Sequence, residues 1–144
     1  MRLRIEFDWD DAGEIELDQA GTLRFPPTTT DPGVYRFALS SENRTSVYIG
    51  EADKLARRMQ HYRTPGPSQP TNIRLNSELR RILASGGQAR LAFASRARLE
   101  IDNQPAVVNL GDKAYRVLVE HAALVEAINS GADEVINLLR VAES

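Results

Sequence analysis

The order of strand-like and helix-like segments along the chain fits an α+β protein. Apolar residues alternate with polar ones, as in half-buried strands, near the N-terminus and over residues 34–39, 45–49 and 88–99. Apolar residues recur every three or four positions, as on one face of a helix, over residues 53–63, 71–84 and 113–129. With 144 residues, 42% of them hydrophobic, the chain is large enough to bury a core.

The first 31 residues carry two strand patterns but no recognisable chemistry. Charged and apolar residues alternate over residues 2–8, which indicates a strand. Residues 10–13, Asp-Asp-Ala-Gly, are typical of a turn, and residues 14–18 alternate again like a returning strand. We therefore expect residues 1–31 to form an acidic β extension packed on a core domain of residues 32–144.

Residues 34–39 and 45–49 are predicted to form a hairpin with a polar turn at residues 41–43. Antiparallel pairing would bring Tyr35 and Tyr48 to the same face of these two strands. Two tyrosines on a hairpin are also a common packing pair, so both interpretations stay open at this point.

The remaining elements follow from helix and turn signals. Asp53 is a plausible N-cap for the first helix, which the proline-rich residues 64–70 end. After the second helix, residues 88–99 are predicted to form a strand. Residues 100–112 are expected to be a loop or a strand-like excursion, and residues 135–141 a short final segment.

The formal net charge is only −2, but the charge is unevenly distributed. Residues 54–98 hold 10 basic residues and one acidic residue, a net charge of +9, between acidic flanks. Arginine supplies 16 of the 18 basic residues in the chain, which favours bidentate contacts to phosphate. The basic block therefore indicates a polyanion-binding surface. The alternative is a solvated helix surface without a ligand.

Composition also excludes several classes of protein. With no cysteine, the chain has no disulfide, no zinc–thiolate site and no thiol nucleophile. No run approaches the roughly 18 apolar residues that span a bilayer. The charged N-terminus is not a secretory signal. We expect a cytoplasmic protein with no membrane partner.

Two of the predicted helices carry candidate site chemistry. Arg58 and Tyr62 are four residues apart and share one helical face. A guanidinium beside a phenol favours phenolate, which can act as a general base. Glu120 lies in an apolar helical run, so it needs a cation, a hydrogen-bond partner or exposure. A lone carboxylate suits Mg²⁺, whereas His61 and His121 form no zinc motif.

Together, these residues resemble the signature of the GIY-YIG nuclease family. The matching elements are Gly33-Val34-Tyr35, Tyr48-Ile49-Gly50, Arg58 eight residues after Gly50, Tyr62 and Glu120. Asn137 is a candidate for an asparagine that follows the glutamate in this family. Two positions depart from the pattern, since Val34 replaces isoleucine and Glu51 stands where lysine is common.

The resemblance implies a small central antiparallel sheet flanked by helices and a metal-dependent DNA endonuclease activity. The implied catalytic residues are Tyr35, Tyr48, Arg58, Tyr62 and Glu120. Glu120 would bind Mg²⁺, with Mn²⁺ as an alternative ion. Tyr48 would help to activate water, while Arg58 would hold the scissile phosphate. Whether Asn137 or His61 takes part stays open.

The DNA backbone would be contacted by arginines on the first two helices, namely Arg57, Arg63, Arg74, Arg80 and Arg81. Such contacts position DNA without specifying its sequence. A partner protein or a second copy of the chain would then supply targeting. The alternative function is a catalytically inactive DNA-binding or interaction domain of the same fold.

Overall fold

The computed structural model describes residues 1–137 and confirms the α+β class. The strands are β1 (Leu3–Glu6), β2 (Asp10–Leu17), β3 (Leu23–Arg24), β4 (Gly33–Ser41), β5 (Arg44–Ala52), β6 (Gln88–Ala94), β7 (Arg98–Ile101), β8 (Gln104–Ala106) and β9 (Glu134–Val135). The helices are α1 (Leu55–Arg63), α2 (Pro70–Ala84) and α3 (Lys113–Asn129). None of these three helices is long and apolar enough to span a membrane. Of the predicted final segment at residues 135–141, the part after residue 137 lies outside the described residues.

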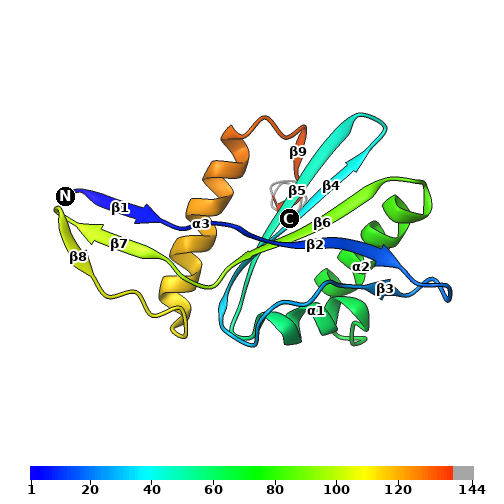
Figure 1. Ribbon diagram of the computed structural model, residues 1–144, viewed down its shortest axis with the longest axis horizontal. Helices are drawn as coiled ribbons and strands as arrows, with labels where there is room; N and C mark the ends of the chain where they lie inside the picture. Colours follow the sequence, from blue (N-terminus) through cyan, green and yellow to red (C-terminus); the bar gives the residue numbers. More distant parts are fainter. Residues whose placement is uncertain (138–144) are drawn as a thin grey trace.

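A six-stranded sheet with the order β3-β2-β6-β4-β5-β9 forms the centre of the molecule (Figure 1). Its neighbouring strands run antiparallel except for β5 and β9. A separate three-stranded sheet, β1-β7-β8, extends away from it. The chain thus has the expected antiparallel sheet with flanking helices, together with a second small sheet.

The predicted hairpin is confirmed as β4 and β5. Glu42 and Asn43 adopt φ angles of 51° and 63°, the left-handed conformation of a tight hairpin turn. The register pairs Tyr35 with Gly50 and Phe37 with Tyr48. Because side chains alternate between faces, Tyr35 and Tyr48 lie on the same face of the sheet.

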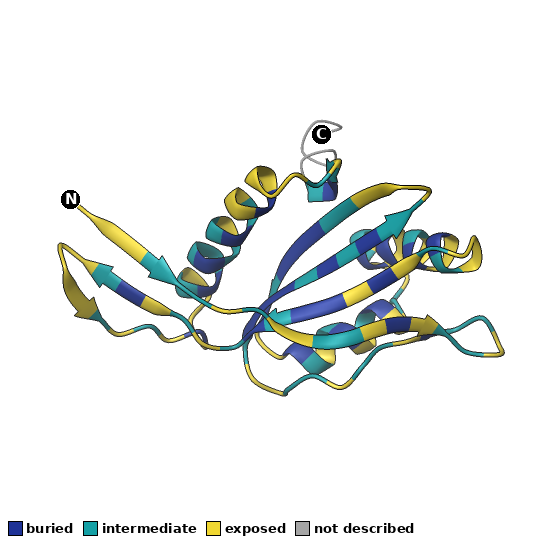
Figure 2. Cartoon of the chain, turned by 45° about the horizontal axis from the view of Figure 1, so that its top comes forward, coloured by how far each residue is buried: buried dark blue, intermediate teal, exposed yellow. Residues whose placement is uncertain are grey.

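The sheet separates two apolar cores. On one face, Phe37 and Tyr62 belong to the core that includes buried residues of α1 and α2. On the other face, Val34 and Ile49 pack with Val119 and its neighbours on α3. Figure 2 shows the buried residues following the central strands and the inner sides of the helices. Burial of both faces supplies the main driving force for folding.

Helix α1 begins differently from the prediction. Its N-cap is Lys54, which makes no side-chain cap, and Asp53 pairs instead with Arg57. The first N–H groups of α1 are satisfied by the segment before β4, since Leu55 N donates to the Asp31 carbonyl at 3.1 Å and Ala56 N to the Thr29 carbonyl at 2.9 Å. The expected Asp53 cap is therefore wrong, because backbone carbonyls already fill this role.

The N-terminal turn prediction is also wrong. Residues 10–13 belong to β2, which pairs with β6 in the main sheet, and a register shift between Asp11 and Gly13 absorbs the turn-like residues. β1 pairs with β7, not with β2. The strand expected at 88–99 is divided into β6 and β7, and residues 100–112 include the β7–β8 hairpin.

Gly33→Ala is expected to destabilise the protein by about 1–3 kcal/mol, the usual range for overpacking. A Cβ atom at Gly33 would lie 2.3 Å from the Ala94 carbonyl oxygen, so β4 and β6 would have to separate. Urea unfolding measures the change. Gly66→Ala is the matched control, since its nearest atoms belong to the Gln69 side chain at 3.5 Å. Equal free energies of unfolding for the two variants would contradict the prediction.

Candidate active site

Three of the predicted site residues form one aromatic cluster. Tyr35 and Tyr48 come from the hairpin and Tyr62 from α1, with ring centroids 6.4 Å apart for Tyr35–Tyr48 and 5.9 Å apart for Tyr35–Tyr62. The hydroxyl oxygens of Tyr35 and Tyr62 are 2.5 Å apart, so one hydroxyl donates a hydrogen bond to the other. All three rings are buried, and Tyr48 has the largest exposure at 6%. The cluster is therefore both core and candidate site.

The glycine of the second motif is needed because the Tyr35 ring lies against it. A Cβ atom at Gly50 would come within 2.3 Å of Cζ and of the hydroxyl oxygen of Tyr35. Any side chain at Gly50 would displace the ring from Tyr62. Tyr35 and Gly50 are cross-strand partners, so the two motifs depend on each other physically.

Burial has a larger effect on the pKa values of Tyr35 and Tyr62 than the neighbouring Arg58 has. Burial raises the pKa of Tyr35 well above its usual value, and Tyr62 and Tyr48 raise it further, whereas Arg58 lowers it by less. The pKa of Tyr62 is also raised, chiefly by burial. The predicted phenolate is therefore wrong for Tyr35 and Tyr62, which stay neutral at ordinary pH because a buried phenolate is poorly solvated.

Arg58 lies at the boundary of this cluster and is partly exposed. Burial acts to lower the pKa of Arg58, but Tyr35, Tyr62 and the Glu51 carboxylate outweigh it, and the net pKa is raised. The guanidinium thus stays charged within electrostatic reach of two phenols and a carboxylate. A fixed, partly desolvated guanidinium is well suited to bind phosphate.

The end of β5 is an open edge of the sheet. β9 pairs with β5 only at Ser46 and Val47. At Ile49 the side chain of Asn137 replaces a strand partner, since Asn137 Oδ1 accepts from Ile49 N at 2.9 Å and Nδ2 donates to Ile49 O at 2.7 Å. Asn137 therefore has a structural contact at this edge. Beyond Ile49, β5 has no strand partner on this side among the described residues, so residues from both layers can meet there.

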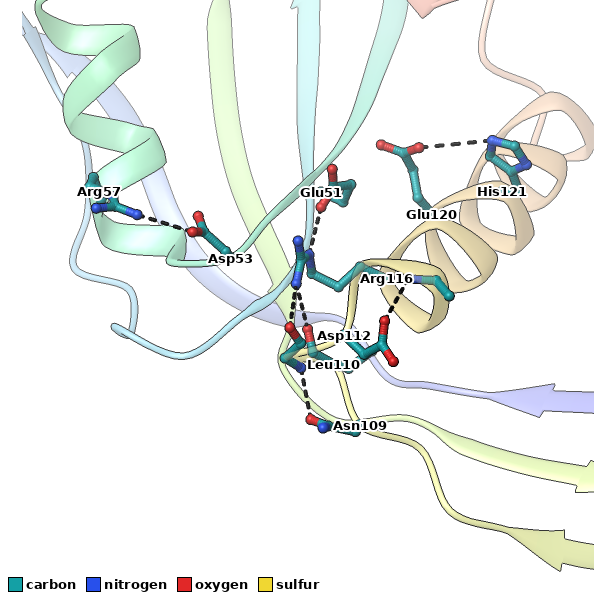
Figure 3. A network of polar contacts seen from close by, with 11 residues as sticks. Glu51, Asp53, Arg57, Asn109, Leu110, Asp112, Arg116, Glu120 and His121 are labelled. Carbon is teal, nitrogen blue, oxygen red and sulfur yellow. Dashed lines mark hydrogen bonds and ion pairs between the residues drawn. The ribbon is translucent and has the colours of Figure 1, made fainter.

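A buried ion pair crosses this edge and was not predicted. Arg116 of α3 binds Glu51 with an Nε–Oε2 distance of 2.6 Å, and their side chains are only 8% and 17% exposed (Figure 3). Arg116 Nη1 also donates to the carbonyls of Leu110 and Gly111 at 3.0 and 3.1 Å. Removing one partner from such a buried pair costs about 3–5 kcal/mol. Arg116 thus places a positive charge directly beside Glu51.

Glu120 approaches the same region from α3. It follows Arg116 by one helical turn, and its side chain is 23% exposed and 3.9 Å from His121 Nε2. In Figure 3, Glu120 and Arg116 project from α3 towards the strands, whereas His121 lies on another side of the helix. Among residues 1–137 there is no cluster of three metal-binding side chains. A single, partly exposed carboxylate fits Mg²⁺, which keeps most of its waters and binds substrate phosphate.

The five predicted DNA-binding arginines are all exposed on the first two helices, and none belongs to the tyrosine cluster. They are Arg57, Arg63, Arg74, Arg80 and Arg81. On this surface Arg57 pairs with Asp53 and Arg81 pairs with Glu78. Exposed pairs of this kind contribute only about 0–1 kcal/mol, so exchanging the carboxylate for a phosphate costs little.

These observations define an α+β protein that has a group of polar side chains at one edge of its central sheet. Neither a protein-family model nor a curated protein matches the sequence. Among solved structures, a mutant of EndoII from bacteriophage T4 is similar, with 20% identity and a TM-score of 0.47. The similarity covers 59% of this chain and 64% of that one, so the chain spans somewhat less than two thirds of EndoII.

The buried phenols predict a specific pH dependence of stability. An unfolded tyrosine ionises near pH 10, whereas the folded pKa values of Tyr35 and Tyr62 are higher. The unfolded chain therefore loses these protons first, and stability falls as pH rises above about 10. Each phenol contributes a slope of up to about 1.4 kcal/mol per pH unit. Urea unfolding between pH 9 and 11 measures it.

Tyr35→Phe should reduce this alkaline slope, because it removes one of the two ionisable groups. Tyr115→Phe, which removes a phenol outside the cluster, serves as the control. A slope that both variants share with the native protein would show that Tyr35 ionises freely in the folded state.

Proposed function

We propose that this chain is a metal-dependent DNA endonuclease that hydrolyses phosphodiester bonds at the open edge of β5. The observation that carries the proposal is the position of Arg58. Its side chain is partly exposed, and it lies near enough to Tyr35, Tyr62 and Glu51 for these groups to raise the pKa of its guanidinium. A partly exposed cation beside neutral phenol hydroxyls is well suited to bind a phosphate diester.

Arg58 binds the scissile phosphate and stabilises the negative charge that develops on it. Tyr48, the least buried phenol of the cluster, orients the water that attacks phosphorus. The water oxygen forms a bond to phosphorus while the bond to the leaving sugar oxygen breaks; the water gives up a proton to solvent and the leaving oxygen takes one up from solvent. Tyr35 and Tyr62 act from behind as positioning residues, because their hydroxyls are buried and bonded to each other.

Glu120 would hold the divalent ion. When bound, Mg²⁺ supplies positive charge that stabilises the leaving oxygen, and Mn²⁺ can take its place. The exposed arginines of α1 and α2 track the DNA backbone, which gives affinity without sequence preference. A partner protein or a second copy of the chain would direct the cut to particular sites.

An inactive DNA-binding domain is the alternative from another class. The burial of Tyr35 and Tyr62 favours it, since packing alone accounts for both rings. The two functions differ in one measurable property. The nuclease cuts DNA only with a divalent ion, whereas the inactive domain binds DNA equally well and leaves it intact.

Glu120→Gln is expected to abolish Mg²⁺-dependent cleavage of plasmid DNA while DNA affinity stays within a few-fold. The change keeps the shape of the side chain and removes the charge that would hold the ion. Cleavage is followed by gel electrophoresis and affinity by fluorescence anisotropy. His121→Gln, at the neighbouring position, is the control and should cut normally. Cleavage by Glu120→Gln at the native rate would exclude Glu120 as the metal ligand.

Arg58→Ala should reduce the cleavage rate by about 10²–10³-fold, the loss expected when one donor to the transition state is removed. Arg57→Ala is the matched control, because Arg57 is 52% exposed and points about 100° away around the helix. Its removal should mainly weaken binding and reduce the salt dependence of affinity. Single-turnover rates at saturating protein separate the two effects. Similar rate losses for both variants would remove Arg58 from the proposed site.

A further inference from the structure

Arg116 is an unusual residue for the position it occupies. It lies in the first turns of α3 yet is one of three polar or charged residues buried among residues 1–137. A cation near the N-terminus of a helix is disfavoured by the helix dipole. The first turn of α3 contains no acidic residue, and the carboxylate of the N-cap Asp112 is bound to Ala114 N. Helix formation therefore does not explain Arg116, and the contacts made by its side chain must do so.

Those contacts join three parts of the chain. The guanidinium binds Glu51 at the end of β5, and it also binds the carbonyls of Leu110 and Gly111 just before α3 begins. A planar guanidinium can satisfy these acceptors at once only in one orientation. Arg116 therefore fixes both the path by which the chain enters α3 and the position of α3 against β5.

The remaining contacts of α3 with the sheet are less directional. The buried residues of its sheet-facing side are, besides Arg116, Val119, Ala123 and Ala127. Small apolar side chains pack against Val34 and Ile49 in the second core. Apolar contact is not directional, so such a helix can shift along its axis or rotate at modest cost. The ion pair supplies the directional contact that this packing lacks.

Glu51 connects this arrangement to the other layer. Its carboxylate binds Arg116 of α3, and its negative charge also raises the pKa of Arg58 on α1. Glu120 follows Arg116 by four residues and therefore lies on the same side of α3. A shift or rotation of α3 that displaces Arg116 from Glu51 therefore also moves Glu120 relative to β5.

We propose that Arg116 is a positioning residue which, through Glu51, holds Glu120 at the edge of β5 where the divalent ion binds. This inference rests on the proposed function, because it concerns the metal-binding glutamate of that site. Arg116 itself touches neither the ion nor DNA. Its loss should weaken metal binding by about tenfold or more, as loss of outer contacts around metal ligands does.

The test uses the full chain and the double variant Glu51→Met/Arg116→Met. Replacing a buried ion pair with apolar residues of similar volume is often neutral for stability, so this variant is expected to fold. Binding of Mn²⁺ is measured by the loss of the free-ion signal in electron paramagnetic resonance. Thermal unfolding and the Mg²⁺ concentration at half-maximal plasmid cleavage are measured alongside. Two single variants are tested in the same way. Arg116→Lys keeps the positive charge but loses the planar guanidinium with its several N–H donors, and Glu51→Gln removes the negative charge.

We expect the double variant to unfold within a few degrees of the native chain, to bind Mn²⁺ about tenfold more weakly, and to need correspondingly more Mg²⁺ for cleavage. Arg116→Lys should be intermediate. Mn²⁺ affinity within twofold of native in a folded double variant would overturn the proposal, since a purely structural pair changes only stability. If the double variant does not fold, the Arg116→Lys and Glu51→Gln affinities decide by the same criterion.

The outcomes also separate this inference from the proposed function. Weaker Mn²⁺ binding by the variants, together with no DNA cleavage by the native chain, would refute the nuclease but support Arg116 as a positioning residue. Native-like Mn²⁺ binding by Glu120→Gln would refute both, because Glu120 would then not be the ligand.

Discussion

The close approach of the Tyr35 ring to the backbone of Gly50 is the constraint on which the site depends. The ring occupies the space that any side chain at residue 50 would need. This contact brings the Tyr35 hydroxyl to Tyr62, and thereby fixes α1 against the hairpin. Arg58 extends from the same helix, so its position follows from the same contact. The position of α1 therefore depends on the contact between Gly50 and the Tyr35 ring.

Much of the fold could be predicted because its signals are local. The β4–β5 hairpin carries its own alternation and turn residues, and α3 begins and ends where its periodicity indicated, at Lys113 and Asn129. The N-terminal strands were misassigned for the opposite reason. Asp10 to Gly13 have the composition of a turn, but pairing with β6 holds them extended and a bulge absorbs the irregularity. Strand partners about 80 residues apart leave no trace in local spacing.

In the candidate site, too, local spacing predicts some contacts and not others. Arg58 and Tyr62 share a helical face, and their spacing places them together. Arg116 and Glu51 are 65 residues apart, so no spacing rule could join them. One signal was present, since Arg116 occupies the apolar stripe of α3 that continues with Val119 and Ala123. The neutral state of Tyr35 also required the structure, because the degree of burial outweighs a nearby charge that the sequence does reveal.

The carboxamide of Asn137 has a consequence beyond local hydrogen bonding. By accepting from and donating to Ile49, it occupies backbone groups that a foreign strand would otherwise use. Exposed strand edges invite pairing with other chains and hence aggregation. β9 shields only Ser46 and Val47 of β5, and the side chain of Asn137 extends this protection to Ile49. One carboxamide thus does at Ile49 what a longer β9 strand would otherwise have to do.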